Sequence, residues 1–144
     1  NFLLMKISKL YIIFIVLLLC SFTNKKTAKS GISFIKGDLK EAVKKANEDD
    51  KYIFMYVYAK WCGNCKKLKK TSFKDTAVGN YYNSNFINLQ VDGESDEGRN
   101  LVSKFKITQY PTLLILDQNG NALTKITGYM KPYILINFGR RIVP

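Results

Sequence analysis

The chain has 144 residues, with 23 Lys or Arg, 11 Asp or Glu and no His, which gives a formal net charge of +12. The absence of histidine excludes Ser-His triads, His-assisted cysteine hydrolases and the common histidine-containing zinc sites. Only three of the basic residues are Arg, the type that reads nucleic acids through bidentate contacts. We therefore expect a solvated lysine-rich surface and no nucleic-acid partner. Weak attraction to anionic membrane is an alternative explanation of the charge.

The N-terminal region has the pattern of an export signal. A basic stretch, Met5–Lys9, precedes the uncharged segment Leu10–Leu19, as in a signal peptide. The segment is short for a membrane span, which needs ~20 residues. We predict a signal peptide or lipoprotein leader over 1–23 and an exported protein that is periplasmic, or anchored in the membrane and facing the periplasm. An uncut N-terminal anchor is the alternative.

Two processing routes follow from the leader. Cleavage after Thr23 fits the small residues near it, whereas Cys20 follows three leucines in a lipobox-like arrangement and is a candidate for lipidation. Residues 24–30 are polar and without periodicity, so they are expected to form a tether. Residues 31–144 then form one small domain.

In chain order, the domain begins with a short predicted strand, Gly31–Ile35. A helix follows from Asp38, with a capping-box start and apolar residues at helical spacing, and it ends near Asn47–Asp50. The run Tyr52–Ala59 is almost wholly apolar and aromatic, which favours a central strand buried on both faces.

Helices and strands are also predicted to alternate in the second half of the chain. The further predicted elements are a helix after Cys62, a short helix from Asp75 to Tyr82, a strand over Phe86–Val91, a solvated acidic loop over Asp92–Gly98, a helix through Leu101 and Phe105, a strand over Pro111–Leu116, a turn at Asp117–Gly120, a strand over Ala122–Thr127 and a helix over Pro132–Phe138. Asn119-Gly120 is a strong hairpin signal. The order β-α-β-α-α-β-α-β-β-α predicts an α/β domain with parallel pairing early and an antiparallel hairpin late.

Two cysteines at Cys-x-x-Cys spacing follow the central strand, in Trp61-Cys62-Gly63-Asn64-Cys65. A strand that ends in such a turn and opens a helix is the arrangement of a dithiol redox site. The first sulfur is expected to be exposed at the helix start, where free N–H groups and the helix dipole favour the thiolate. The second lies about one turn further in.

The cysteine count limits metal binding. Cys20 is the third and last cysteine, so a single chain lacks the four thiolates of a Cys₄ zinc site. A zinc ion shared between two chains is the remaining alternative. We expect no metal and no cofactor other than the redox-active Cys62–Cys65 disulfide.

Several motifs together resemble the thioredoxin superfamily. They are Ala59–Lys66, Thr71–Asp75 with Val78, Val91-Asp92, Tyr110–Leu113 and Thr127–Met130. The resemblance covers roughly residues 32–138 and is strongest to exported bacterial thioredoxin-like proteins and the periplasmic C-terminal domain of DsbD proteins. It implies a thioredoxin fold, in which helices flank a central mixed β-sheet.

The resemblance also implies roles for the site residues. Cys62 would be the nucleophile and Cys65 the resolving thiol, with Trp61, Gly63 and Asn64 supporting the site. Trp61 would cover the dithiol as an apolar lid, a role that overlaps with plain core packing. The substrate-binding residues would be Tyr110, Pro111 and Thr112, with a cis bond before Pro111.

Three positions depart from the family pattern. Tyr56 stands where thioredoxins carry a buried Asp, Asn88 stands where a buried Lys is expected, and Asn64 replaces the usual Pro between the cysteines. An unperturbed phenol titrates near pH ~10, so Tyr56 is not an equivalent proton acceptor. The group that deprotonates Cys65 is therefore unassigned.

The resulting hypothesis is a monomeric thiol–disulfide oxidoreductase that reduces protein disulfides outside the cytoplasm. A membrane or soluble dithiol partner would restore its reduced form, and the leader or a lipidated Cys20 could tether it to the membrane. The same site run as an oxidase or isomerase is one rival. A non-catalytic binding module is another. A copper-delivery protein of related fold is disfavoured because such proteins rely on a histidine.

Overall fold

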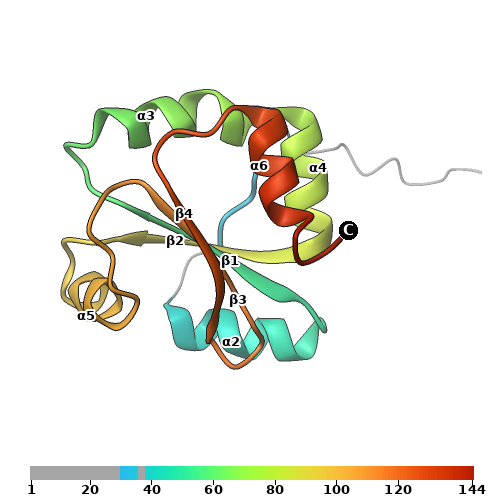
Figure 1. Ribbon diagram of the computed structural model, residues 1–144. Coiled ribbons are helices and arrows are strands. Elements are labelled where there is room, and N and C mark those ends of the chain that lie inside the picture. The colour runs from blue at the N-terminus through green and yellow to red at the C-terminus, as the bar shows by residue number, and fades with distance from the viewer. Residues whose placement is uncertain (1–29, 36–37) are drawn as a thin grey trace, which may run out of the picture.

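The computed structural model describes residues 30–35 and 38–144 (Figure 1). The predicted leader over 1–23, with the lipidation candidate Cys20, lies outside the described residues, as do residues 24–29 of the tether. Within the described ranges, no helix combines the length and apolar character needed to cross a membrane.

A four-stranded mixed sheet forms the centre of the domain. Its strands are β1 (Tyr52–Tyr58), β2 (Phe86–Asp92), β3 (Thr112–Leu116) and β4 (Ala122–Thr127), arranged in the order β2-β1-β3-β4. β1 pairs in parallel with β2 and antiparallel with β3, and β3 pairs antiparallel with β4. The predicted parallel start and antiparallel hairpin are therefore confirmed.

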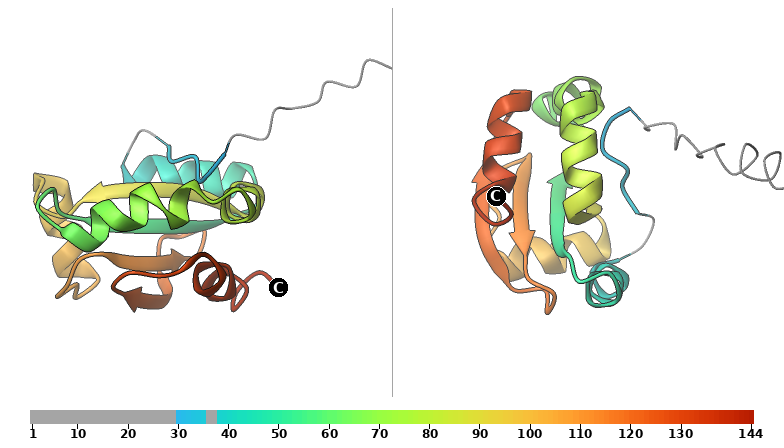
Figure 2. Two further views of the ribbon diagram at one scale, coloured as in Figure 1. Left: turned by 90° about the horizontal axis from the view of Figure 1, so that it is seen from above. Right: turned by 90° about the vertical axis from the view of Figure 1, so that its right-hand side faces the viewer.

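Helices cover both faces of this sheet. They are α2 (Leu39–Glu48), α3 (Gly63–Lys70), the 3-10 turn η1 (Ser72–Lys74), α4 (Thr76–Asn85), α5 (Asp96–Lys104) and α6 (Pro132–Gly139). Figure 1 shows α3, α4 and α6 on one side of the sheet and α2 on the other. α4 and α6 run beside each other (Figure 2), and the Tyr82 hydroxyl of α4 donates a 2.7 Å hydrogen bond to the Leu135 carbonyl of α6.

Successive residues of β1 enter two different cores, as the predicted double burial requires. Phe54 and Tyr56 belong to an aromatic core under α3, α4 and α6. Ile53, Met55 and Val57 belong to an aliphatic core under α2 and α5. All five side chains are fully buried, because side chains alternate between the faces of a strand.

The predicted first strand is wrong. Residues 31–35 form only an isolated bridge, between Ile35 and Leu89. Gly31 has a φ of 87°, and the amide of Ile32 donates to the Phe73 carbonyl at 2.7 Å. The segment is therefore bound to the η1 turn and not to the edge of the sheet over its length.

The predicted acidic loop over 92–98 is shorter than expected. Its last three residues belong to α5, which Ser95 caps by accepting a hydrogen bond from the Gly98 amide. Acidic side chains in a first helical turn interact favourably with the helix dipole, and Asp96 and Glu97 occupy that turn. The same residues that suggested a solvated loop thus start a helix.

Candidate active site

Cys62 and Cys65 are joined by a disulfide at the start of α3. β1 ends at Tyr58, and Cys62 is the N-cap of the helix, where its Sγ accepts a 3.1 Å hydrogen bond from the Cys65 amide. The predicted strand–turn–helix arrangement around the two cysteines is therefore present. A sulfur at this position lies at the positive end of the helix dipole, which favours its thiolate form.

Both cysteines are buried, although Cys62 was expected to be exposed. Cys62 is 4% exposed and Cys65 is 2% exposed, and both contact the aromatic core. The expectation of an exposed Cys62 is wrong for the disulfide form, because the turn packs against that core. Gly63 and Asn64, between the cysteines, are exposed.

Trp61 is not a core residue. Its side chain is 67% exposed, and its Nε1 donates a 2.6 Å hydrogen bond to Glu94 Oε1. Its ring forms a T-shaped pair with the Tyr110 ring, at 6.0 Å between centroids. The core-packing interpretation of Trp61 is therefore wrong. The ring is held against the loop after β2, and the role of Glu94 had no signal in the sequence.

Two further contacts tie the dithiol turn to that same loop. Lys60 Nζ lies 3.5 Å from Asp92 Oδ2, and the Gly93 amide donates to the Tyr58 carbonyl at 2.8 Å. The turn between β1 and α3 and the loop between β2 and α5 thus form one connected front surface, which we define by Lys60, Trp61 and residues 92–94.

The segment before β3 lies level with the end of β1. Val57 pairs with Thr112 in the sheet register, so Pro111 and Tyr110 continue past the point where β1 leads into the dithiol turn. The Tyr110–Pro111 peptide bond is cis. Thr112 is buried, and its hydroxyl donates to the Gln109 carbonyl at 2.7 Å.

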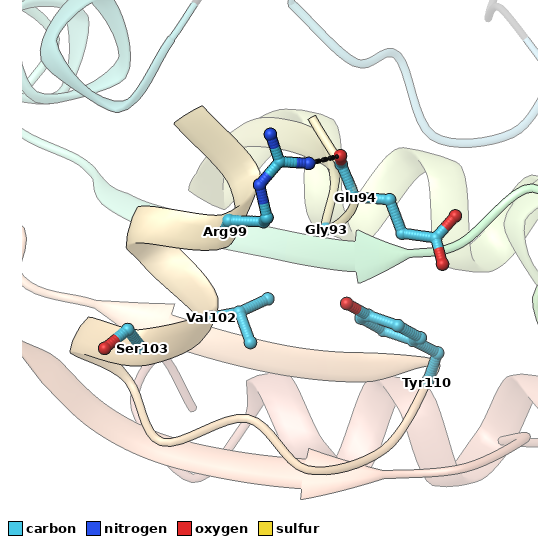
Figure 3. Close-up of a pocket in the computed structure, with 6 residues that line it drawn as sticks. All are labelled: Gly93, Glu94, Arg99, Val102, Ser103 and Tyr110. Atoms are coloured by element: carbon cyan, nitrogen blue, oxygen red, sulfur yellow. Dashed lines mark hydrogen bonds between the residues drawn. The ribbon is translucent and has the colours of Figure 1, made fainter. Parts of the chain in front are cut away.

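A pocket of about 670 Å³ adjoins the front surface. It is lined by Gly93, Glu94, Arg99, Val102, Ser103 and Tyr110. Figure 3 shows the Val102 side chain beside the Tyr110 ring, and Arg99 donating to the backbone carbonyl of Glu94. A side chain at Gly93 would collide with the Tyr110 hydroxyl, so any larger residue there requires the Tyr110 ring to move. Sequence reasoning missed this pocket.

Aromatic side chains form the back of the dithiol. The Tyr56 hydroxyl donates to the Cys65 carbonyl at 3.3 Å, and the Tyr56 ring stacks on Tyr58 at 5.4 Å between centroids. Burial raises the pKa of Tyr56 well above its ordinary value, and the nearby Tyr58 adds to the shift. Tyr56 therefore remains a neutral phenol and a hydrogen-bond donor.

The Asn88 side chain donates hydrogen bonds to groups outside β2. Its amide nitrogen lies 3.4 Å from the Ser33 and Tyr82 carbonyls and 3.1 Å from Asn83 Oδ1. These contacts hold the segment before α2 against α4.

Within the described part of the chain, no group of three or more Cys, Asp or Glu side chains is placed to hold a metal ion.

Comparison with known proteins supports the fold. Residues 39–141 match the family model of the thioredoxin-like domain. Over 98 residues the chain is 39% identical to the thiol:disulfide interchange protein DsbD of Colwellia psychrerythraea, an alignment that covers 65% of this chain and 16% of that protein. Similar DsbD proteins of Actinobacillus pleuropneumoniae and Yersinia pestis are covered over 16% and 15% of their length. The chain thus spans only a small part of these curated relatives.

Solved structures show the same architecture. A candidate disulphide-isomerase from Bacteroides thetaiotaomicron is 36% identical with a TM-score of 0.70, and the match covers 77% of this chain and 92% of that chain. The oxidised C-terminal domain of Neisseria meningitidis DsbD is 21% identical with a TM-score of 0.61, over 72% of this chain and 91% of that chain, and shows the fold alone. The predicted thioredoxin fold is confirmed, and the chain belongs to the thioredoxin-like domain family.

Proposed function

We propose that this protein is a thiol–disulfide oxidoreductase that reduces protein disulfides outside the cytoplasm. The observation that carries the proposal is the Cys62–Cys65 disulfide at the N-terminus of α3. Two cysteines at this spacing after a strand and at a helix start form the arrangement of a dithiol redox site. The DsbD relatives, named as thiol:disulfide interchange proteins, support the same reaction class.

In the proposed reaction, Cys62 is the nucleophile and Cys65 the resolving thiol. The Cys62 thiolate attacks one sulfur of a substrate disulfide, forms a mixed disulfide and releases the other substrate sulfur as a thiolate. The Cys65 thiolate then attacks the Cys62 sulfur, which restores the Cys62–Cys65 disulfide and releases the second substrate sulfur. The substrate gains two electrons and, after protonation, two protons, and the protein loses the same two electrons.

The proposed substrate edge is the backbone of Tyr110, Pro111 and Thr112. The sheet register brings this segment level with the end of β1, and Gly63 and Asn64, between the two cysteines, are exposed. An extended substrate chain could pair with this backbone in the way a peptide adds to a sheet. Trp61 offers an exposed apolar surface beside it, and the 670 Å³ pocket next to Tyr110 offers room for a substrate side chain.

The proposed partners are protein disulfides as substrates and a membrane or soluble dithiol as electron donor. The export proposal rests on the leader pattern over 1–23. A fusion of this leader to a periplasm-dependent reporter is expected to be active, and a cytoplasmic reporter would contradict export. Mass spectrometry of the mature N-terminus distinguishes a lipidated Cys20 from cleavage near Thr23.

The reducing direction competes with oxidation and isomerisation by the same two cysteines. The Bacteroides thetaiotaomicron relative is described as a candidate disulphide-isomerase, which keeps that alternative open. Equilibration of Cys62–Cys65 with glutathione buffers decides between them. A reductase is expected to lie near the thioredoxin potential of about −270 mV, an isomerase at about −180 mV and an oxidase at about −120 mV.

The activity itself is tested by reduction of insulin with dithiothreitol as electron donor. The native chain and Cys20→Ser are expected to accelerate the reaction equally. Cys62→Ser is expected to abolish the acceleration, because it removes the nucleophile. An inactive native chain would favour the non-catalytic binding module.

A further inference from the structure

We infer that a second pocket, behind the dithiol, is the route by which Cys65 loses its proton, and that Lys66 and Lys69 stabilise the resulting thiolate. The inference rests on the proposed function, in which Cys65 must become a thiolate to resolve the mixed disulfide. It gives a route for the deprotonation of Cys65, for which no base is assigned because Tyr56 stands where thioredoxins carry a buried Asp.

No buried carboxylate is available for this step. All 11 Asp and Glu residues of the chain fall in the part that the structure describes, and none of them is buried. Tyr56, at the strand position behind Cys65, is a neutral phenol that donates its hydrogen to the Cys65 carbonyl oxygen at 3.3 Å. The oxygen of a neutral phenol is a very weak base, so Tyr56 does not remove the proton from the Cys65 thiol.

The second pocket reaches the otherwise buried residue Cys65. It has a volume of about 270 Å³ and is lined by Tyr56, Tyr58, Ala59, Lys60, Cys65, Lys66 and Lys69. A water molecule in the liquid occupies about 30 Å³, so the pocket has room for several. Cys65 is only 2% exposed, yet it forms part of this wall.

The charged groups facing the pocket are predominantly positive. Tyr56 and Tyr58 line it from β1, Lys60 from the turn, and Lys66 and Lys69 from α3. Asp92, at the end of β2, lies 3.5 Å from Lys60 and offsets that one charge. Lys66 and Lys69 have no carboxylate within ion-pair distance among the described residues.

The two α3 lysines are placed by helix geometry. Residues three apart lie on one side of a helix, so Lys66 and Lys69 line the pocket together. The Lys69 ammonium group lies 5.3 Å from the centre of the Tyr58 ring, a cation–π contact that holds it over the pocket wall. The ammonium group of Lys67, the residue after Lys66, instead lies 4.5 Å from the centre of the Tyr129 ring.

The proposed step is a proton transfer from the Cys65 thiol to water in the pocket. Nearby positive charges lower the free energy of a thiolate relative to a thiol, so Lys66 and Lys69 increase the fraction of Cys65 present as the nucleophile. The thiolate then attacks the Cys62 sulfur of the mixed disulfide, and the substrate sulfur departs as a thiolate. Lys66 and Lys69 act through Cys65 and are positioning residues, not catalytic ones.

The test compares two lysine pairs on the same helix in a Cys62→Ser background. One variant carries Lys66→Gln and Lys69→Gln, and the matched control carries Lys67→Gln and Lys70→Gln. Both lose two charges at the same i,i+3 spacing. The measurement is the rate of alkylation of Cys65 by iodoacetamide as a function of pH, followed by peptide mass mapping, which separates Cys65 from Cys20.

The pocket pair is expected to move the midpoint of alkylation upward by about half to one pH unit, equivalent to a threefold to tenfold lower thiolate fraction at neutral pH. The control pair is expected to move it by less than a third of that amount. Added salt should reduce the difference between the two pairs, because it screens partly exposed charges.

Equal shifts from both pairs would overturn the inference, since only overall charge would then matter, and so would no shift from the pocket pair. The measurement needs no turnover, because iodoacetamide reacts with the Cys65 thiolate directly. A failure of the proposed function would appear separately, as a native chain that does not reduce insulin.

Discussion

In front of the dithiol, Trp61 and Glu94 meet through an exposed hydrogen bond, whereas behind it the Tyr56 and Tyr58 rings of β1 stack on each other. The front consists of two loops joined by polar contacts at the surface. The back is a strand whose Tyr56 side chain is fully buried in the aromatic core. The same two sulfurs thus separate a region that can contact a partner from a region that holds the fold.

This difference predicts how each region responds to substitution. Exposed polar contacts contribute little to the free energy of unfolding, so changes in the front are expected to alter reaction with protein substrates more than stability. Buried aromatic side chains contribute several kcal/mol through packing, so changes in the back are expected to alter stability first.

The largest expected effect is at Tyr56. Tyr56→Ala leaves a cavity in the aromatic core and is expected to lower the free energy of unfolding by about 3–5 kcal/mol. Tyr56→Phe keeps the ring and loses only the hydrogen bond to Cys65, at a cost of about 0.5–1.5 kcal/mol. Urea unfolding measures both. Insulin reduction by Tyr56→Phe is expected to stay near the native rate, and its loss would show that the Tyr56 hydroxyl has a chemical role.

The next effect is at Gly93, where the front surface contacts Tyr110. Gly93→Ala forces its methyl group into the Tyr110 hydroxyl, which is expected to cost about 1–3 kcal/mol of stability as overpacking does elsewhere and to displace the proposed substrate edge. Gly63→Ala is the control, because nothing lies within 4 Å of a methyl group there. Equal thermal unfolding of the two variants would contradict the packing described for Gly93.

A smaller stability effect, with a clear functional one, is expected at Trp61. Trp61→Ala should change the free energy of unfolding by less than about 0.5 kcal/mol, because the ring is 67% exposed. Insulin reduction should slow about tenfold, because loss of a Trp contact that anchors a partner costs at least about 1 kcal/mol. Reaction with a small aromatic disulfide should change less than threefold.

Tyr133→Ala is the control for Trp61. Tyr133 is a comparably exposed aromatic residue, 62% exposed, on α6. It is expected to leave both reactions unchanged. If Trp61→Ala slows the two disulfides by the same factor, Trp61 acts on the dithiol itself and not on the protein substrate.

The smallest effect is expected at Glu94. Glu94→Gln keeps an acceptor for Trp61 Nε1 but removes the charge, so stability should change by less than about 0.5 kcal/mol. Insulin reduction should fall no more than threefold, and less at high salt. A loss as large as that of Trp61→Ala would show that the carboxylate, and not the ring, is what a substrate contacts.

Much of the fold could be predicted from the sequence because its signals are local. The apolar run over 52–59, the Cys-x-x-Cys turn and Asn119-Gly120 each define an element with its neighbours alone. The strand expected over 31–35 failed because its backbone is held by Phe73, a residue far along the chain. The prediction of an acidic loop up to Gly98 was wrong because α5 begins at Asp96 with Ser95 as its N-cap. The spacing of apolar residues did not indicate this helix start.

The candidate site divides in the same way. Cys62 and Cys65 could be found from spacing, since the chemistry needs both within one turn. The partners Glu94 and Lys69 could not, because their contacts with Trp61 and Tyr58 cross between elements. The burial of Cys62 was also missed, since it depends on how the turn packs against the aromatic core.

Trapping of the mixed disulfide tests the central claim most directly. The variant Cys65→Ser keeps the proposed nucleophile and removes the resolving thiol, so incubation with an oxidised protein substrate should accumulate a covalent complex that dithiothreitol releases. Peptide mass mapping is expected to place the link at Cys62, and Cys62→Ser should form no such complex through Cys65. A link through Cys65, or no complex with an intact Cys62, would contradict the account.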